Sequence, residues 1–286
     1  ALTAGLFVSG CGSDKAGGIG SVVSSVVDGG DEKAAAKLNT LIDATNRFNS
    51  DNASFAQFQA EGLAKLKGGF AEGAITNQPH YDRLQADLEK AKKEGSTFKE
   101  VDAERDNVLN ILNELVPVYK DLTAYDDSKA YMNDGGAKGK ELAAKYVAAV
   151  EKFDAAYAKF NETLNKANAE QSKKQIEKLK KDGKKGYAAA MESTLRLTEL
   201  VDKLEKAPQN ADKAAVEKEL SEIEALLKSI NNDRGQVLAD RYNSVVGDVR
   251  QVLADPSDNN LNNMIEGFNG YIDTYNSTTP DQFDAK

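Results

Sequence analysis

Apolar residues between positions 142 and 164 recur at the spacing of one face of a long helix. From Leu142, intervals of four, four, three, four, three and four lead to Tyr146, Val150, Phe153, Tyr157, Phe160 and Leu164. Such intervals keep the side chains on one stripe, like the seam of a coiled coil. No glycine pair or proline interrupts the segment before Gly183. We therefore expect one helix of about 45 residues, roughly 65 Å long.

The chain beyond Asp31 has the same helical character and no sustained alternation of apolar and polar residues. We expect further helices over residues 31–67 and 79–95, around Pro117, and before Pro208, and then one long helix over 216–249 and a final one over 261–275. Pro117 predicts a kink or a break in its helix, and the apolar spacing slips near Gly235. The predicted fold class is all-α, an elongated antiparallel bundle of long amphipathic helices. Residues 31–278 would form a single helical domain, and residues 279–286 a C-terminal tail.

The N-terminal segment predicts a lipid anchor. Residues 1–10 read ALTAGLFVSG, are uncharged and mostly apolar or small, and look like the remnant of a signal peptide. Val8, Ser9, Gly10 and Cys11 resemble the bacterial lipobox, in which cleavage before the cysteine leaves a thiol that accepts a diacylglyceryl group. Residues 11–30 would then be the lipidated cysteine and a flexible linker rich in Gly and Ser, and residues 12–30 would span about 24 Å. The alternative is that Cys11 is a small buried hydrophobe.

This anchor predicts localisation to the bacterial cell envelope. Gly12 follows the cysteine where an Asp favours retention at the inner membrane. We therefore expect the outer membrane, facing the periplasm or the surface, if the organism has two membranes. The sequence contains no run of 18 apolar residues that would predict a membrane-spanning helix.

Composition narrows the chemistry. The 37 Lys and Arg against 46 Asp and Glu give a net charge of −9, which argues against a nucleic-acid surface. One Cys and one His make a zinc site of those residues close to impossible. We expect His80 to be exposed or to cap a helix. The pattern indicates no catalytic constellation, cofactor or metal site.

Tyrosines and acids suggest one ligand groove as an alternative to plain packing. The candidate groove residues are Tyr119, Tyr125, Asp126, Asp127, Tyr131, Tyr146 and Tyr157. Tyrosine hydroxyls that face a groove can bind a sugar-like or apolar ligand. An aromatic stripe at helical spacing is more often core, and an acidic cluster is more often a solvated turn.

Seven lysines lie between Lys173 and Lys185, with only Glu177 and Asp182 among them. Their expected role is to solvate the end of a helical hairpin and to favour a helix C-terminus. Alternatively, they contact anionic lipid headgroups or a cell-wall polymer.

Three segments carry a family resemblance. The sequences KLNTLIDATNRFN (37–49), LVPVYKDLTAYDDSKAYMNDGGAKGKEL (115–142) and FNGYIDTYN (268–276) are similar to parts of the YiiG-like bacterial lipoproteins. The resemblance covers about residues 32–278. It implies a helical lipoprotein domain of unknown function, with no catalytic residues to carry over.

Two function classes follow. The first is an anchored, non-catalytic helical protein that binds or spaces protein or glycan partners of the cell envelope. The second is an envelope receptor or enzyme that holds a small molecule in the Tyr and Asp groove. An apolar pocket lined by these residues would favour the second class.

The anchor makes a direct prediction. Intact-mass spectrometry of the natively expressed protein should find residues 1–10 removed and Cys11 carrying acyl groups. An unmodified Cys11 with residues 1–10 still attached would contradict the anchor.

Overall fold

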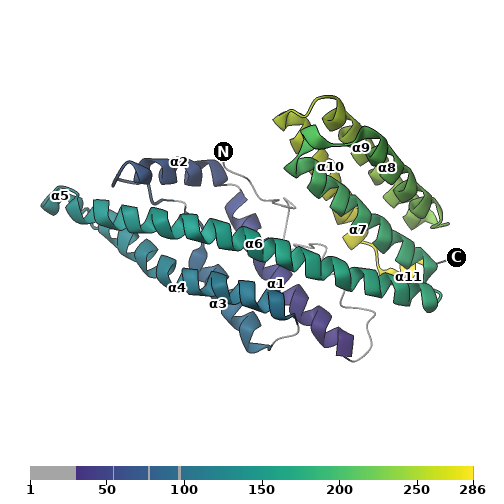
Figure 1. Cartoon of the computed structure of the whole chain (residues 1–286), viewed down its shortest axis with the longest axis horizontal. Coiled ribbons are helices and arrows are strands. Elements are labelled where there is room, and N and C mark those ends of the chain that lie inside the picture. Colours follow the sequence, from purple (N-terminus) through teal and green to yellow (C-terminus); the bar gives the residue numbers. More distant parts are fainter. Residues whose placement is uncertain (1–29, 54, 77, 96–97, 286) are drawn as a thin grey trace. The chain divides into compact units, whose positions relative to one another are not determined.

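The computed structural model describes residues 30–53, 55–76, 78–95 and 98–285, and there the predicted all-α class is confirmed. Every regular element of this part is helical (Figure 1). The α-helices are α1 (Gly30–Ala53), α2 (Ala56–Lys67), α3 (Tyr81–Lys93), α4 (Lys99–Asp127), α5 (Tyr131–Asp134), α6 (Ala137–Lys181), α7 (Lys185–Lys206), α8 (Lys213–Lys228), α9 (Asp233–Ala254), α10 (Asp258–Asn276) and α11 (Pro280–Phe283). A single 3-10 turn, Pro208–Asn210, follows α7.

The described helices form two compact units. The α1–α6 unit comprises Lys37–Ala167, and the α7–α11 unit comprises residues 30–36 and 168–285. Helices α1 and α6 each contribute residues to both units. The single helical domain over residues 31–278 stays a prediction. The predicted signal remnant, Cys11 and the linker lie outside the described residues.

The predicted seam on α6 supplies the core of the α1–α6 unit. The seven apolar residues of this seam, which begins at Leu142 and ends at Leu164, are all buried. Tyr146 and Phe160 are completely inaccessible to solvent. They pack with apolar side chains of α1, α3 and α4, such as Leu38, Leu88 and Leu112. The helix has the 45 residues that the spacing predicts. The core interpretation of the aromatic stripe is therefore confirmed.

Helices α7, α8, α9 and α10 of the other unit pack each against the next, and α10 returns to α7. Short connections between consecutive helices favour this antiparallel order. Leu197, Ile223 and Val245 are buried in the shared core. The Tyr271 hydroxyl lies there at 3.1 Å from both the Ser193 and the Thr194 hydroxyl oxygens. These contacts satisfy polar atoms inside an otherwise apolar bundle.

Three predicted helices differ in the structure. Residues 31–67 form α1 and α2 because Asn52 turns its side chain back, with Nδ2 donating to the Phe48 carbonyl at 2.5 Å. The long helix over 216–249 is two helices, and Asn232 accepts from the Gly235 amide at 3.0 Å to start α9. Helix α4 continues through Pro117, which is exposed, so the predicted break is wrong.

Residues 279–286, expected as a tail, include α11. Phe283 is buried and stacks against Tyr187 and Tyr275, with ring centroids 6.1 and 5.9 Å apart. The Asn232 side chain donates to the Phe283 carbonyl at 2.9 Å. The Gly186 amide donates to Asp284 Oδ1 at 2.6 Å, and a Cβ at Gly186 would lie 2.0 Å from the Phe283 carbonyl oxygen. This close approach requires glycine at position 186.

Replacing the buried ring tests this docking. Phe283→Ala should lower the free energy of unfolding by about 3 kcal/mol, because it removes a buried aromatic side chain. Phe58, which is 59% exposed, provides the matched control. Phe58→Ala should change the free energy by no more than about 0.5 kcal/mol in the same urea titration. Equal effects of the two substitutions would contradict the docking.

Candidate functional site

Most of the predicted groove residues lie near one end of the α1–α6 unit, where α4 ends and α6 begins. The turn between the two helices contains α5 and two glycines with left-handed backbone, Gly135 at φ 63° and Gly136 at φ 85°. Residues other than glycine rarely adopt this backbone conformation. The glycines thus turn the chain from α5 into α6. We call residues 125–138 the tip.

A hydrogen-bonded pair closes the tip. The Tyr125 hydroxyl donates to Asp134 Oδ1 at 2.6 Å. The same carboxylate accepts from the amides of Gly136 at 2.9 Å and Lys138 at 3.1 Å. The Tyr125 hydroxyl and these amides lower the pKa of Asp134. Asp134 therefore fixes the start of α6.

Asp126 and Tyr131 connect the tip to the segment after α2. Asp126 is 9% exposed, and its Oδ2 accepts from the Gly73 amide at 2.9 Å. Hydrogen bonding to the Glu72 carboxylate raises the pKa of Tyr131 to about 12. The Phe70 ring packs between the tyrosines, 5.1 Å from Tyr125 and 5.4 Å from Tyr131. Asp127 points to solvent instead.

The other predicted groove tyrosines belong to the core. The Tyr146 hydroxyl donates to Gln78 Oε1 at 2.9 Å, and the Tyr157 hydroxyl donates to Asn49 Oδ1 at 2.9 Å. Burial raises the pKa of both phenols. Tyr119 is half-buried, with its ring 6.2 Å from that of Tyr146. These hydroxyl groups serve internal hydrogen bonds.

An open depression lies at the tip, and Tyr125 alone of the seven predicted residues lines it. Its other lining residues are Asp121, Ala124, Ser128, Ala130, Asn133, Asp134 and Lys138. The depression presents carboxylate, amide, hydroxyl and ammonium groups, which can hydrogen-bond a polar ligand. Spacing could have found part of it, because residues 121, 124, 125 and 128 share one face of α4.

In the described part of the chain, no group of three or more His, Cys, Asp or Glu residues is placed to hold a metal ion. His80 is exposed at the N-cap position of α3, and its side chain makes no capping hydrogen bond.

None of the described helices combines the length and the apolar character that crossing a bilayer requires.

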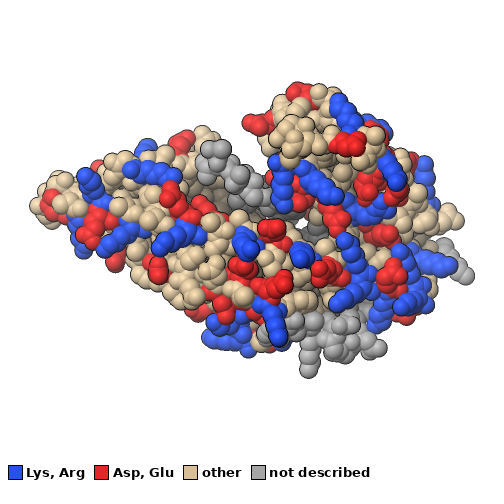
Figure 2. Space-filling view, in the orientation of Figure 1, with Lys and Arg blue, Asp and Glu red and all other residues tan. Residues whose placement is uncertain are grey.

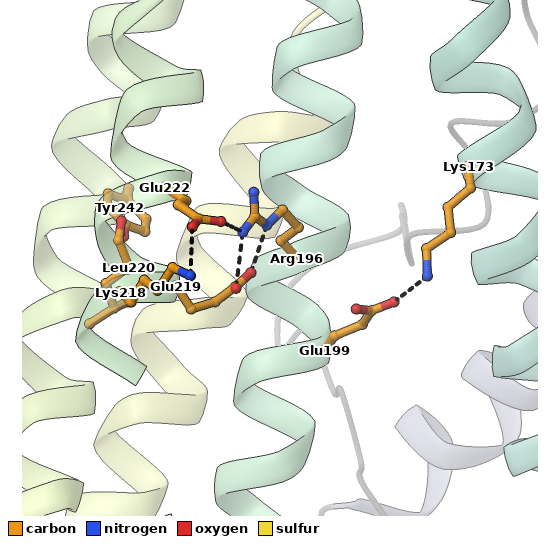
Figure 3. A network of polar contacts seen from close by, with 8 residues as sticks. All are labelled: Lys173, Arg196, Glu199, Lys218, Glu219, Leu220, Glu222 and Tyr242. Carbon is orange, nitrogen blue, oxygen red and sulfur yellow. Dashed lines mark hydrogen bonds and ion pairs between the residues drawn. The ribbon is translucent and has the colours of Figure 1, made fainter. Parts of the chain in front are cut away.

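The α7–α11 unit carries a charged network along α7 (Figure 3). Arg196 donates to Glu219 through Nε at 2.6 Å and through Nη2 at 3.0 Å, and it also binds Glu222. Hydrogen bonds to Glu219 raise the pKa of Arg196. On the other side of α7, Lys173 pairs with Glu199 at 3.2 Å. Bidentate geometry makes Arg196 a clamp between α7 and α8.

Glu205 near the end of α7 is the acid with the most unusual titration in this unit. Burial, aided by the charge of Asp202, raises its pKa to about 7. Its Oε2 finds no hydrogen-bond donor in the described part of the chain. Ionisation of Glu205 therefore destabilises the folded state as the pH rises from the unfolded pKa, near 4.5, through about 7.

A glutamine at position 205 tests this effect. Glu205→Gln should have the same Tm as the parent protein at pH 4.5 and a Tm about 2 °C higher at pH 8, because the amide cannot ionise. Exposed Glu266 on α10 is the control, and Glu266→Gln should show no such pH-dependent difference. Thermal scans at both pH values provide the measurement. A gain at pH 4.5 equal to that at pH 8 would rule out titration as the cause.

Comparison with protein families gives one match. The profile of a family described as "Protein of unknown function (DUF3829)" matches residues 32–237. The matched range covers more than two thirds of the 286 residues and includes the tip. Searches among curated proteins and among solved structures find no match.

Proposed function

As the chain belongs to the DUF3829 family, whose function is unknown, we propose that it is a membrane-anchored bacterial lipoprotein whose non-catalytic helical body binds or spaces partners in the cell envelope. The proposal of a non-catalytic body is supported by the hydrogen bonds of the tyrosine hydroxyl groups. Tyr125, Tyr146 and Tyr157 each donate to an acceptor within the α1–α6 unit. A catalytic or ligand-binding hydroxyl must instead face the reacting or bound molecule.

The anchor rests on the residues before and after Cys11. Small residues precede the cysteine, as a narrow peptidase site requires, and a Gly- and Ser-rich segment follows it. Each buried CH₂ contributes about 0.8 kcal/mol, so one acyl chain holds a protein only marginally and two or three hold it durably. The linker would let the helices stand off the bilayer.

The resemblance to the YiiG-like lipoproteins supports the same proposal at a finer level. Its segments cover α1, the α4–α6 turn and α10. Together with Gly12 after the cysteine, it favours the envelope, and the outer membrane where two membranes exist.

Metabolic labelling tests the anchor. The full gene is expressed in a bacterium with two membranes, and the cells are fed an alkyne analogue of palmitate. The parent protein should carry the label and sediment with membranes, because Cys11 is acylated. Cys11→Ser should lose both, whereas the control Ser13→Ala should keep them. Equal labelling of parent and Cys11→Ser would contradict the proposal.

The open depression at the tip favours a second candidate function, a receptor for a polar envelope molecule. Asp121, Asn133 and Lys138 project hydrogen-bonding groups toward it from α4, α5 and α6. A thermal-shift screen of cell-wall saccharides and peptides tests this candidate. A ligand that raises Tm in the parent protein but not in an Asp121→Ala, Asn133→Ala variant would favour the receptor over the spacer.

A further inference from the structure

Six of the seven lysines of residues 173–185 divide into two groups in the structure, and the seventh, Lys185, is exposed at the start of α7. Lys173 pairs with Glu199 at 3.2 Å, and Lys180 pairs with Glu192 at 2.8 Å. The two lysines and the two glutamates are each seven residues apart, so they connect the antiparallel helices α6 and α7 at two successive positions. Lys184 lies 3.7 Å from Asp281 of α11. These three lysines therefore serve the packing of the α7–α11 unit.

Lys174, Lys178 and Lys181 form the second group, which we call the lysine stripe. Their intervals of four and three place them on one face of α6, on the opposite side of its buried face from Lys173 and Lys180. Lys174 and Lys181 are exposed, and Lys178 is half-buried. None of the three forms an ion pair with an acid of the described residues. The stripe is a positive surface without ion-paired acids among the described residues.

This surface contrasts with the rest of the chain. Seven lysines against Glu177 and Asp182 give residues 173–185 a charge of 7 − 2 = +5, whereas the whole chain has −9. Figure 2 shows Lys and Arg side chains, with Asp and Glu among them, near the end of α6. Such an asymmetry attracts an anionic partner.

The start of α1 shares a cluster with this end of α6. Ala35 is fully buried in the same apolar cluster as Ile176 and Leu179, which are neighbours of the stripe on α6. The chain that leads back to Cys11 therefore leaves from the unit that carries the stripe. The predicted linker between Cys11 and α1 would span about 24 Å.

We propose that the lysine stripe binds the anionic phospholipid headgroups of the membrane that holds the lipid anchor, an inference that rests on the proposed function. Each lysine near an anionic surface strengthens binding about fivefold, so three lysines alone bind weakly. A tether changes this, because it raises the effective concentration of headgroups at the stripe into the millimolar range. The membrane rather than a wall polymer is the partner because the tether delivers the stripe to the bilayer.

The single cysteine allows a test that does not depend on native acylation. The full chain is coupled through Cys11 to a maleimide lipid in phosphatidylcholine vesicles, with or without 30% phosphatidylglycerol. Lysine acetylation by a water-soluble ester is then followed by mass spectrometry. Acetylation of the stripe should slow about threefold or more on the anionic vesicles, and 0.5 M NaCl should abolish the difference. Lys65, Lys90 and Lys120, which are exposed and form no ion pair with a described residue, are internal controls and should react equally on both vesicles.

A charge-matched pair of variants separates the stripe from general attraction. Lys185, which is exposed and lies four residues beyond Lys181, should also be protected on anionic vesicles in the parent chain. The triple variant Lys174→Gln, Lys178→Gln, Lys181→Gln should remove this protection. The Lys65→Gln, Lys90→Gln, Lys120→Gln variant carries the same charge change and should keep it. Equal acetylation of the stripe on both vesicles would overturn the proposal, as would protection by soluble anionic wall polymer but not by vesicles. An unmodified Cys11 in cells would overturn the anchor while leaving the vesicle result standing.

Discussion

Burial of one face of α6 is the constraint from which both units follow. Up to Leu164, this face is apolar and belongs to the core of the α1–α6 unit. Between Asn168 and Gln175 the buried side chains turn polar, and from Ile176 the face joins the second apolar cluster. Both amide atoms of Gln175 lack a hydrogen-bond partner among the described residues. Because a polar stretch cannot serve an apolar core, one continuous helix supplies two separate cores.

Buried phenols give these cores their specificity. The Tyr271 hydroxyl meets Ser193 and Thr194, and the Tyr242 hydroxyl donates to the Leu220 carbonyl at 2.5 Å. Each contact is satisfied in one helix register, and a shifted helix would leave a buried hydroxyl unpaired. The same principle governs the tip, where Tyr125 and Asp134 set the path from α4 into α6. Hydroxyl groups that suggested a binding groove therefore serve to define the packing.

Periodicity predicted the fold class, the length of α6 and the burial of its aromatic stripe, because burial and helical spacing are properties of neighbouring residues. It placed α1–α2 and α8–α9 in single helices, because Asn52 and Asn232 end or start helices through specific side-chain hydrogen bonds. Periodicity could not predict the docking of α11, because Phe283 packs against Tyr187, which is almost a hundred residues away in the sequence. The seven candidate groove residues do not line one groove, again because their positions depend on partners distant in the sequence. Which way Tyr146 and Tyr157 point depends on Gln78 and Asn49, and composition carries no trace of those partners.

The end of the family match has a practical consequence for fragment design. The matched range stops at residue 237, within the first turns of α9, whereas α10 and α11 complete the bundle beyond it. A recombinant fragment trimmed to the matched residues would leave the inner faces of α7 and α8, with Leu197 and Ile223, bare to water. Such a fragment should aggregate or recruit chaperones. A protein isolated with this fragment would then bind the exposed apolar residues and not a native binding surface.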